Sequence, residues 1–227
     1  MLKDNLAAVR SRIDAVCRAC GRDPQSVTLV GVSKYSVAAT VNEAIAAGLT
    51  DIAENRVQSA KEKFPLVNLT GVKKHLIGHL QSNKAKDAVA IFDLIQSVDS
   101  ISLLLEINRR AELAGKVQDI LLQVDLAGEE QKFGLPELAV PIFLEAVTRL
   151  TNVRLLGLMT MAPLTEDQAL ISAVFKRCHT LFRTIGREWP ASERIKMQHL
   201  SMGMSGDFAS AIAEGATMVR IGSLIFK

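Results

Sequence analysis

A lysine stands directly after the first strongly apolar run of the chain. Residues 27–33 read VTLVGVS, and Lys34 follows them. A charged side chain at such a strand end either extends into solvent or lies, partly desolvated, in the mouth of a sheet. In the second case its neutral amine can attack an aldehyde carbon and form a Schiff base. The position alone favours a solvated lysine, so the residues around it have to decide.

Two segments rich in glycine and serine lie near the C-terminus. Residues 201–207 read SMGMSGD and precede a predicted helix, and residues 222–223 (GS) follow the last apolar run. Glycine allows backbone N–H groups to approach an anion, and serine hydroxyls add further donors. Ordinary tight turns have the same composition. The pairing of two such loops at the ends of the last two predicted strands favours a phosphate site.

Arg220 lies within the last apolar run, two residues before Gly222. If its side chain points inward, it is a buried cation that needs a partner. A pyridine nitrogen and an acid such as Asp125 are both candidates. A lysine at one strand end, a phosphate cradle at two others and a cation for a ring nitrogen together fit pyridoxal 5′-phosphate (PLP).

These residues have to be positioned by a regular alternation of helices and strands. A helical period of apolar residues opens the chain at 2–20, and Gly21 and Pro24 end it. Later helical stretches are predicted near residues 38–47, 55–63, 81–90, 100–114, 136–149, 166–187 and 205–214. The predicted strands are residues 27–33, 51–53, 74–78, 94–98, 120–125, 154–159, 197–201 and 218–221.

Strict alternation of this kind predicts right-handed crossovers and a parallel sheet. The number of strands favours one closed (β/α)8 TIM barrel that spans residues 1–227, with the extra N-terminal helix covering the gap after the last strand. A doubly wound open sheet has the same alternation, but no G-x-G-x-x-G follows the first strand. In a barrel, the carboxyl ends of the strands carry the chemistry. Lys34 and both glycine-serine loops follow such ends.

The composition limits the class of protein. The chain has 227 residues, of which 48% are apolar, and a formal net charge of +3. Such a chain can bury a large core, and its scattered basic residues argue against nucleic acid as a partner. No apolar run reaches the ~18 residues of a membrane span, and the N-terminus lacks the apolar region of a signal peptide. We therefore expect a cytoplasmic protein without membrane contact.

Two spacings are similar to metal-binding motifs. Cys17 and Cys20 form C-x-x-C, and His75 and His79 are four residues apart. A zinc site needs further ligands at matching spacing, so we interpret the cysteines as helix residues and the histidines as core and barrel-mouth residues. With Cys178 the number of cysteines is odd, which fits a reducing compartment. We expect no metal and no disulfide.

Several motifs occur in order along nearly the whole chain: residues 30–34 (VGVSK), 54–58 (ENRVQ), 75–84 (HLIGHLQSNK), 97–100 (SVDS), 131–134 (QKFG), 157–162 (GLMTMA), 200–208 (LSMGMSGDF) and 215–222 (GATMVRIG). On these stretches the chain resembles the pyridoxal phosphate homeostasis family, also called the YggS/PROSC family. That family is similar to the N-terminal barrel domain of alanine racemase.

The resemblance implies a PLP-binding protein in which Lys34 forms the Schiff base and Arg220 is the partner of the pyridine nitrogen. It also implies Lys132 as a second basic contact near the barrel mouth. The phosphate would be held by Ser201, Ser205, Gly222 and Ser223, and the cofactor would be lined by Asn55, His75 and Met159.

The sequence departs from the family pattern at Ala53, Lys74, Tyr35 and Ser223, where Gly, Trp, Thr and Thr are usual. Tyr35 and Ser223 are mild changes. Lys74 puts the packing of the third strand in doubt and leaves the cofactor site untouched.

Two classes of function fit a PLP barrel. One is a cytoplasmic, monomeric protein that holds PLP for vitamin B6 homeostasis and hands it to PLP-dependent apo-enzymes, without turnover. The other is a fold-type III amino-acid racemase, which needs an acid/base group on each face of the cofactor. The one tyrosine of the chain, Tyr35, follows Lys34 directly, and neighbours on an extended strand point to opposite sides. We expect Tyr35 not to face Lys34 across the cofactor, which favours the non-enzyme.

Overall fold

A closed ring of parallel strands forms the centre of the molecule. The computed structural model describes residues 1–128, 133–189 and 192–227. The strands run in the order β4-β3-β2-β1-β9-β8-β7-β5, and a further pairing between β4 and β5 closes the ring. The ring strands are β1 (Thr28–Val32), β2 (Asp51–Glu54), β3 (Lys73–Leu76), β4 (Leu94–Val98), β5 (Gln118–Asp125), β7 (Val153–Met159), β8 (Ile195–Ser201) and β9 (Met218–Ile221).

This closure confirms the predicted (β/α)8 barrel. It rules out the doubly wound open sheet, because each of the two edge strands of an open sheet has a neighbour on one side only. The short strand β6 (Leu135–Pro136) lies outside the ring and pairs with the end of β5.

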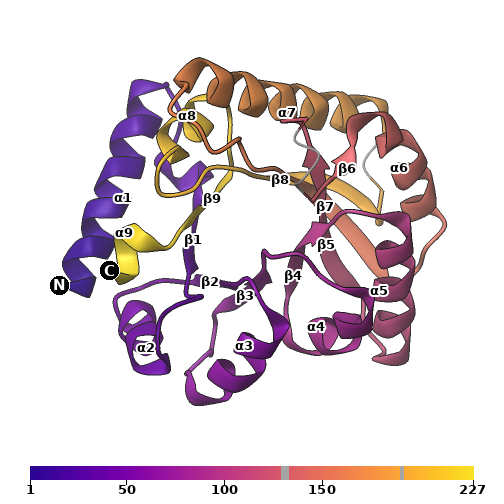
Figure 1. Cartoon of the computed structure of the whole chain (residues 1–227), viewed down its shortest axis with the longest axis horizontal. Helices are drawn as coiled ribbons and strands as arrows, with labels where there is room; N and C mark the ends of the chain where they lie inside the picture. Colours follow the sequence, from indigo (N-terminus) through magenta and orange to yellow (C-terminus); the bar gives the residue numbers. More distant parts are fainter. Residues whose placement is uncertain (129–132, 190–191) are drawn as a thin grey trace.

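Helices surround the ring on the outside (Figure 1). They are α2 (Ala38–Ala46), α3 (Val57–Lys63), α4 (Ala85–Ile91), α5 (Ile101–Leu113), α6 (Val140–Thr148), α7 (Gln168–Glu188), α8 (Phe208–Ala213) and α9 (Ser223–Phe226). The last of them has only four residues. None of the helices in the described residues combines the length and the apolarity needed to span a lipid bilayer.

The leading helix α1 (Leu2–Ala19) fills the space that the short α9 leaves open. It packs against α9, α8 and α2, as the sequence predicts (Figure 1). Its buried side chains, Leu6, Val9, Ile13 and Cys17, recur at helical spacing and face the barrel. Gly21 then takes φ = 66°, a conformation that favours glycine and ends the helix.

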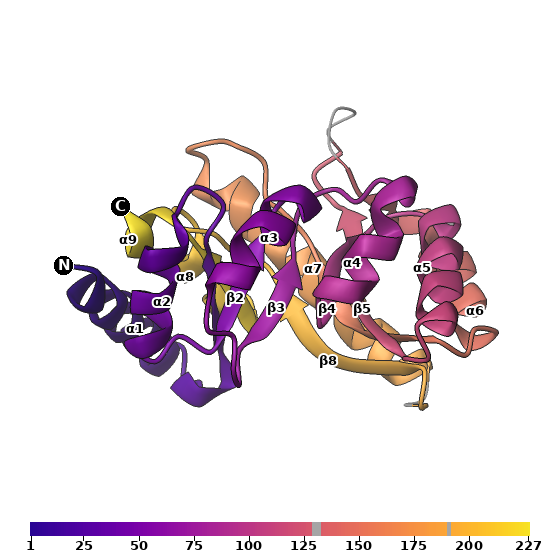
Figure 2. The same cartoon turned by 90° about the horizontal axis from the view of Figure 1, so that it is seen from below.

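The strands divide the apolar core into an outer and an inner part. Alternate side chains point outward to the helices and inward to the barrel axis. The inner cluster includes Val30 and Val32 of β1, Met159 of β7 and Met218 of β9. The interior also holds buried polar side chains, among them Gln96 and Arg220. Figure 2 shows the barrel from the side, with the arrowhead of β3 directed to the rim where the carboxyl ends of the strands gather.

Candidate cofactor site

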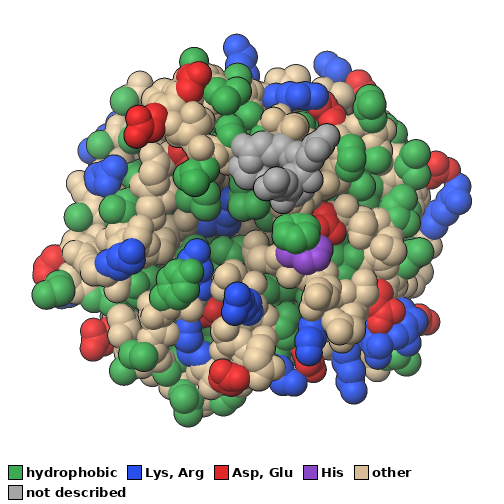
Figure 3. Space-filling view, in the orientation of Figure 1, with side chains coloured by type: hydrophobic (Ala, Val, Ile, Leu, Met, Phe, Trp, Pro, Cys, Tyr) green, Lys and Arg blue, Asp and Glu red, His purple; other side chains and the backbone are tan. Residues whose placement is uncertain are grey.

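A cavity of about 740 Å³ opens at the carboxyl ends of the barrel strands. Its size lies within the range of small-molecule sites. Figure 3 shows this face hollowed near its middle, with a basic side chain at the floor of the hollow. The cavity brings together most of the residues that the sequence selects, namely Lys34, Asn55, Ser205, Arg220, Gly222 and Ser223.

Lys34 lies in a turn and not on an extended strand. The strand β1 ends at Val32, and the amide of Ser36 donates to the carbonyl oxygen of Ser33 (2.8 Å), which closes the turn. Within this turn the Nζ atom of Lys34 lies 5.1 Å from the centre of the Tyr35 ring. The expectation that the two side chains point to opposite sides is therefore wrong. Tyr35 stands on the same side as the amine and lines the same cavity.

A buried ion pair holds the residue before Lys34. The Nζ atom of Lys63, from α3, donates to Glu54 Oε1 and to the Ser33 carbonyl oxygen, both at 2.6 Å. The hydroxyl of Ser33 donates to the same carboxylate oxygen (2.6 Å). Glu54 is fully buried, and its Oε2 atom has no hydrogen-bond partner in the described part of the chain. No sequence pattern joins Glu54 to Lys63, and the one signal is a carboxylate at the end of the buried strand β2.

The two glycine-serine loops lie side by side along one wall of the cavity. Ser205 and Gly206 follow β8, and Gly222 and Ser223 follow β9. The amide of Arg220 donates to the carbonyl oxygen of Gly203 (3.0 Å), which ties the loops together. A Cβ atom on Gly203 would lie 2.5 Å from the Cβ atom of Ala211, so only glycine fits this turn. Hydroxyl and amide donors at two adjacent strand ends are the donor set that a phosphate group requires.

The side chain of Arg220 points into the barrel and lines the cavity from the barrel interior. Its exposed fraction is 3%, and burial lowers the pKa of its guanidinium to about 10, so it stays charged at neutral pH. Nη1 donates to Ser201 Oγ (2.8 Å) and Nη2 to the carbonyl oxygen of Thr160 (3.0 Å). Asp125, the alternative partner considered from the sequence, accepts from the amides of Ala127 and Gly128.

The remaining predicted residues do not line the cavity. His75, Met159 and Ser201 are buried inside the barrel, with exposed fractions of at most 1%. Their contact with a cofactor stays a prediction, and the hydroxyl of Ser201 is bonded to Arg220 and Gln96. Lys132 lies outside the described residues.

The cavity is also lined by residues that no sequence pattern brings together, among them His79, Gln123 and Phe133. His79 stacks on Phe133, with ring centres 3.8 Å apart, and its Nδ1 atom lies 3.1 Å from Asp99 Oδ2. Gln123 Nε2 donates to the Phe133 carbonyl oxygen (2.6 Å). The sequence predicts His79 at the barrel mouth, but no pattern joins it to a phenylalanine that follows another strand.

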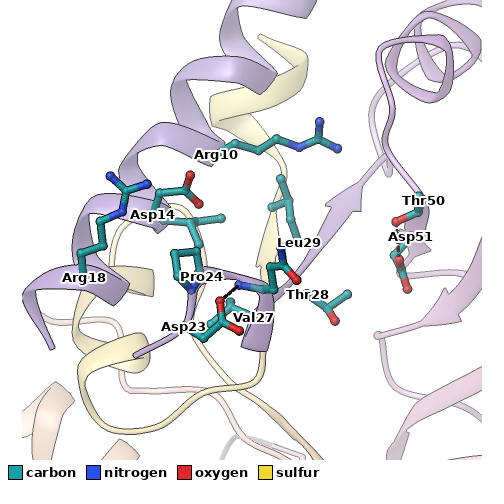
Figure 4. A pocket seen from close by; sticks show the side chains of 12 residues that line it. Arg10, Asp14, Arg18, Asp23, Pro24, Val27, Thr28, Leu29, Thr50 and Asp51 are labelled. Atoms are coloured by element: carbon teal, nitrogen blue, oxygen red, sulfur yellow. Dashed lines mark hydrogen bonds between the residues drawn. The ribbon is translucent and has the colours of Figure 1, made fainter. Parts of the chain in front are cut away.

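A second hollow, of about 790 Å³, lies at the opposite end of the barrel (Figure 4). Arg10, Asp14 and Arg18 reach it from α1, and Asp51 lies at the start of β2. Both charge signs are present, and its described lining includes no lysine. Although it is slightly larger, this hollow does not offer the amine that a Schiff base requires.

Comparisons with known proteins identify the family of the whole chain. Residues 5–227 match the family model of the alanine racemase N-terminal domain. A pyridoxal phosphate homeostasis protein of Aquifex aeolicus is 38% identical over 224 residues, which cover 98% of this chain and 96% of that protein. Its counterpart in Pseudomonas aeruginosa is 37% identical over 225 residues, 99% of this chain and 94% of that protein.

Solved structures add the shape of the whole barrel. PipY of Synechococcus elongatus, solved with PLP bound, superposes with a TM-score of 0.88 at 37% identity over the full length of both chains. An alanine racemase of Clostridium difficile shares the fold alone, with a TM-score of 0.73 at 15% identity over 98% of this chain and 56% of the racemase. The family model and the fold define a barrel of the alanine racemase N-terminal class. Within that class, the chain belongs to the pyridoxal phosphate homeostasis protein family.

Proposed function

We propose that this protein binds PLP through a Schiff base on Lys34 and serves in PLP homeostasis as a carrier of the cofactor. The main observation in support of this proposal is that Lys34, Arg220 and the two glycine-serine loops line one cavity. The names of the relatives and the PLP-bound structure of PipY support the proposal.

The donor set fits each part of PLP. The amine of Lys34 suits the aldehyde, the guanidinium of Arg220 suits the pyridine nitrogen, and Ser205, Gly222 and Ser223 suit the phosphate. When bound, PLP supplies a reactive aldehyde and an electron-accepting ring. A guanidinium that is charged at neutral pH and lies beside the ring nitrogen would oppose protonation of that nitrogen, which would weaken the ring as an electron acceptor.

We propose further that the protein has no catalytic turnover. A racemase needs acid/base groups on both faces of the bound cofactor. Tyr35 lies beside the amine of Lys34, so the two do not form a pair across the cavity. The support for a racemase is confined to a likeness of fold to enzymes of much greater length.

Titration with PLP tests the Schiff base. Wild-type protein is expected to develop the visible absorbance of lysine-linked PLP and to retain the cofactor after borohydride reduction. Lys34→Ala should lose both signals, whereas Lys86→Ala, at an exposed position of α4, should keep both. Retention of the same reducible chromophore in Lys34→Ala would contradict the proposed site.

The absence of turnover is tested with amino acids. PLP-loaded protein is incubated with L-alanine and other L-amino acids in D₂O, and deuterium at the α-carbon and optical rotation are followed. We expect no stereoinversion above the rate of free PLP. Rapid stereoinversion that depends on Lys34 would establish the racemase instead.

We propose that the carrier is a monomer, that it is located in the cytoplasm, and that it delivers PLP to PLP-dependent apo-enzymes. The free cysteines support a reducing compartment. Transfer is measured by mixing the PLP-loaded protein with an apo-enzyme and following the recovery of enzyme activity in excess of that given by the free PLP present.

A further inference from the structure

A chain of hydrogen bonds crosses the interior of the barrel from the cofactor cavity to the opposite end. Arg220 Nη1 donates to Ser201 Oγ (2.8 Å), and that hydroxyl donates to Gln96 Oε1 (2.6 Å). The amide Nε2 of Gln96 lies 2.9 Å from His75 Nδ1, and His75 Nε2 lies 3.0 Å from Asp51 Oδ1. Each member comes from a different strand, β9, β8, β4, β3 and β2.

The two ends of the chain dictate the direction of every bond in it. A guanidinium can only donate, and an ionised carboxylate can only accept. The Ser201 hydroxyl therefore accepts a hydrogen bond from Arg220 and donates one to the side-chain carbonyl oxygen of Gln96. The amide group of Gln96 then donates to His75 Nδ1, so the proton of the imidazole is on Nε2, where it donates to Asp51.

The anchor of this chain lies at the end of the barrel farthest from the cofactor cavity. Asp51 lines the second hollow, and Thr50 Oγ1 donates to its other carboxylate oxygen (2.8 Å), as Figure 4 shows. Burial acts to raise the pKa of Asp51, but the hydrogen bonds from His75 and Thr50 outweigh it and hold the pKa below its ordinary value. Asp51 is therefore an anion at neutral pH.

At the cationic end of the chain, the Arg220 guanidinium makes no hydrogen bond to a carboxylate within the described residues, and the charge of Asp207 acts on it without such a bond. Both hydrogen bonds of the Arg220 guanidinium go to neutral oxygens, those of Ser201 and Thr160. A buried cation of this kind depends on oriented dipoles, and hydrogen bonds in a chain polarise one another. The negative charge of Asp51 thus favours the orientation in which the acceptor ends of the intervening groups face Arg220.

We infer that Gln96 and His75 are positioning residues, which hold the Arg220 guanidinium at the cavity wall through a directional chain anchored on Asp51. The inference rests on the proposed PLP site, in which Arg220 is the partner of the pyridine nitrogen. It gives His75 a role at a distance from the cofactor, and it gives Ser201 a role in orienting Arg220. Gln96 acquires a function that the sequence did not indicate.

The variant Gln96→Met tests the inference, because methionine has a similar shape but neither the amide donor nor the carbonyl acceptor. We expect the dissociation constant of PLP to rise about tenfold. We also expect the pH midpoint of the visible absorbance of bound PLP to shift, because a displaced guanidinium no longer donates a hydrogen bond to the ring nitrogen and no longer opposes its protonation. A residue that only supports the fold would lower stability and leave that midpoint unchanged.

Gln118→Met is the matched control. Gln118 is also a fully buried glutamine of the barrel, but its amide donates to the backbone carbonyl oxygens of Phe92, Asp93 and Asp119. Its replacement should lower stability without a change in the dissociation constant or the pH midpoint. Should Gln96→Met fail to fold, Asp51→Asn at the far end tests the same chain, with a smaller change in the same direction.

The outcomes separate the two proposals. If wild-type protein shows no absorbance that depends on Lys34, the proposed cofactor site fails. If the wild-type protein binds PLP through Lys34, and Gln96→Met and Asp51→Asn bind it with wild-type affinity and an unchanged pH midpoint, only the positioning role is overturned.

Discussion

Lys34 and Lys63 are two lysines near the end of β1, and their amines have different surroundings. The amine of Lys63 donates to the carboxylate of Glu54 and to a backbone carbonyl oxygen. These two hydrogen bonds hold the Lys63 amine against the buried Glu54 carboxylate and the backbone. The amine of Lys34 lies over the edge of the cavity beside Tyr35. Of these two lysines, Lys34 is the one that lines the cavity, and we therefore propose that it is the one a bound aldehyde reaches.

The three cysteines should differ in reactivity at the same residue scale. Burial raises the pKa of the Cys178 thiol to about 12 and also raises the pKa of Cys17, whereas Cys20 is exposed just after α1. A raised pKa disfavours the reactive thiolate. At about pH 8 we expect Ellman's reagent to titrate a single fast thiol, and to titrate all three only after denaturation. Cys20→Ser should abolish the fast phase, and a fast phase of two thiols in native protein would disprove this assignment.

At the scale of elements, the sequence predicts the strands closely because most are short apolar runs between helical stretches, whereas residues 51–53 are placed mainly by their position between two such stretches. Residues 94–98 and 218–221 are predicted with the bounds that β4 and β9 have. The helices α4 and α6 begin later than predicted, at Ala85 and Val140. Short 3₁₀ turns, Ser82–Lys84 and Glu137–Ala139, precede them. Apolar periodicity does not distinguish such a turn from the first turn of an α-helix.

Two glycines in β7 and α7 give a matched test of these elements. Gly157 has φ = 147°, and a Cβ atom there would lie 1.8 Å from the carbonyl oxygen of His199 on β8. Gly157→Ala is expected to lower the free energy of unfolding by about 3 kcal/mol. Gly186 lies in α7, and its added Cβ would be 3.6 Å from Met197, an ordinary contact. Gly186→Ala should raise the free energy of unfolding by about 0.5–1 kcal/mol.

Urea denaturation of both variants measures these changes. Similar free energies of unfolding for the two variants would show that the close approach of β7 and β8 does not require a glycine.

At the scale of the whole molecule, the sequence indicates which residues follow the strands but not which residues meet inside the ring. Gln96 and Ser201 are 105 residues apart in sequence, yet their side chains share a hydrogen bond across the barrel. The bond depends on strand register and on the closure between β4 and β5, and neither leaves a local pattern. For the same reason the sequence does not indicate that His75 and Ser201 are buried inside the barrel and do not line the cavity, and their contact with a cofactor stays a prediction. The turn at Lys34 escaped prediction because residues 27–33 give no sign that β1 ends at Val32.

Peptide mapping of the reduced protein tests the central claim most directly. The protein is saturated with PLP, reduced with borohydride, digested and analysed by mass spectrometry. The proposed site predicts that the phosphopyridoxyl mass is found on the peptide that contains Lys34, and that Lys34→Ala yields no modified peptide. Predominant labelling of another lysine, such as Lys63 or the cavity-lining Lys227, would contradict it, as would saturable binding of PLP without any reducible label.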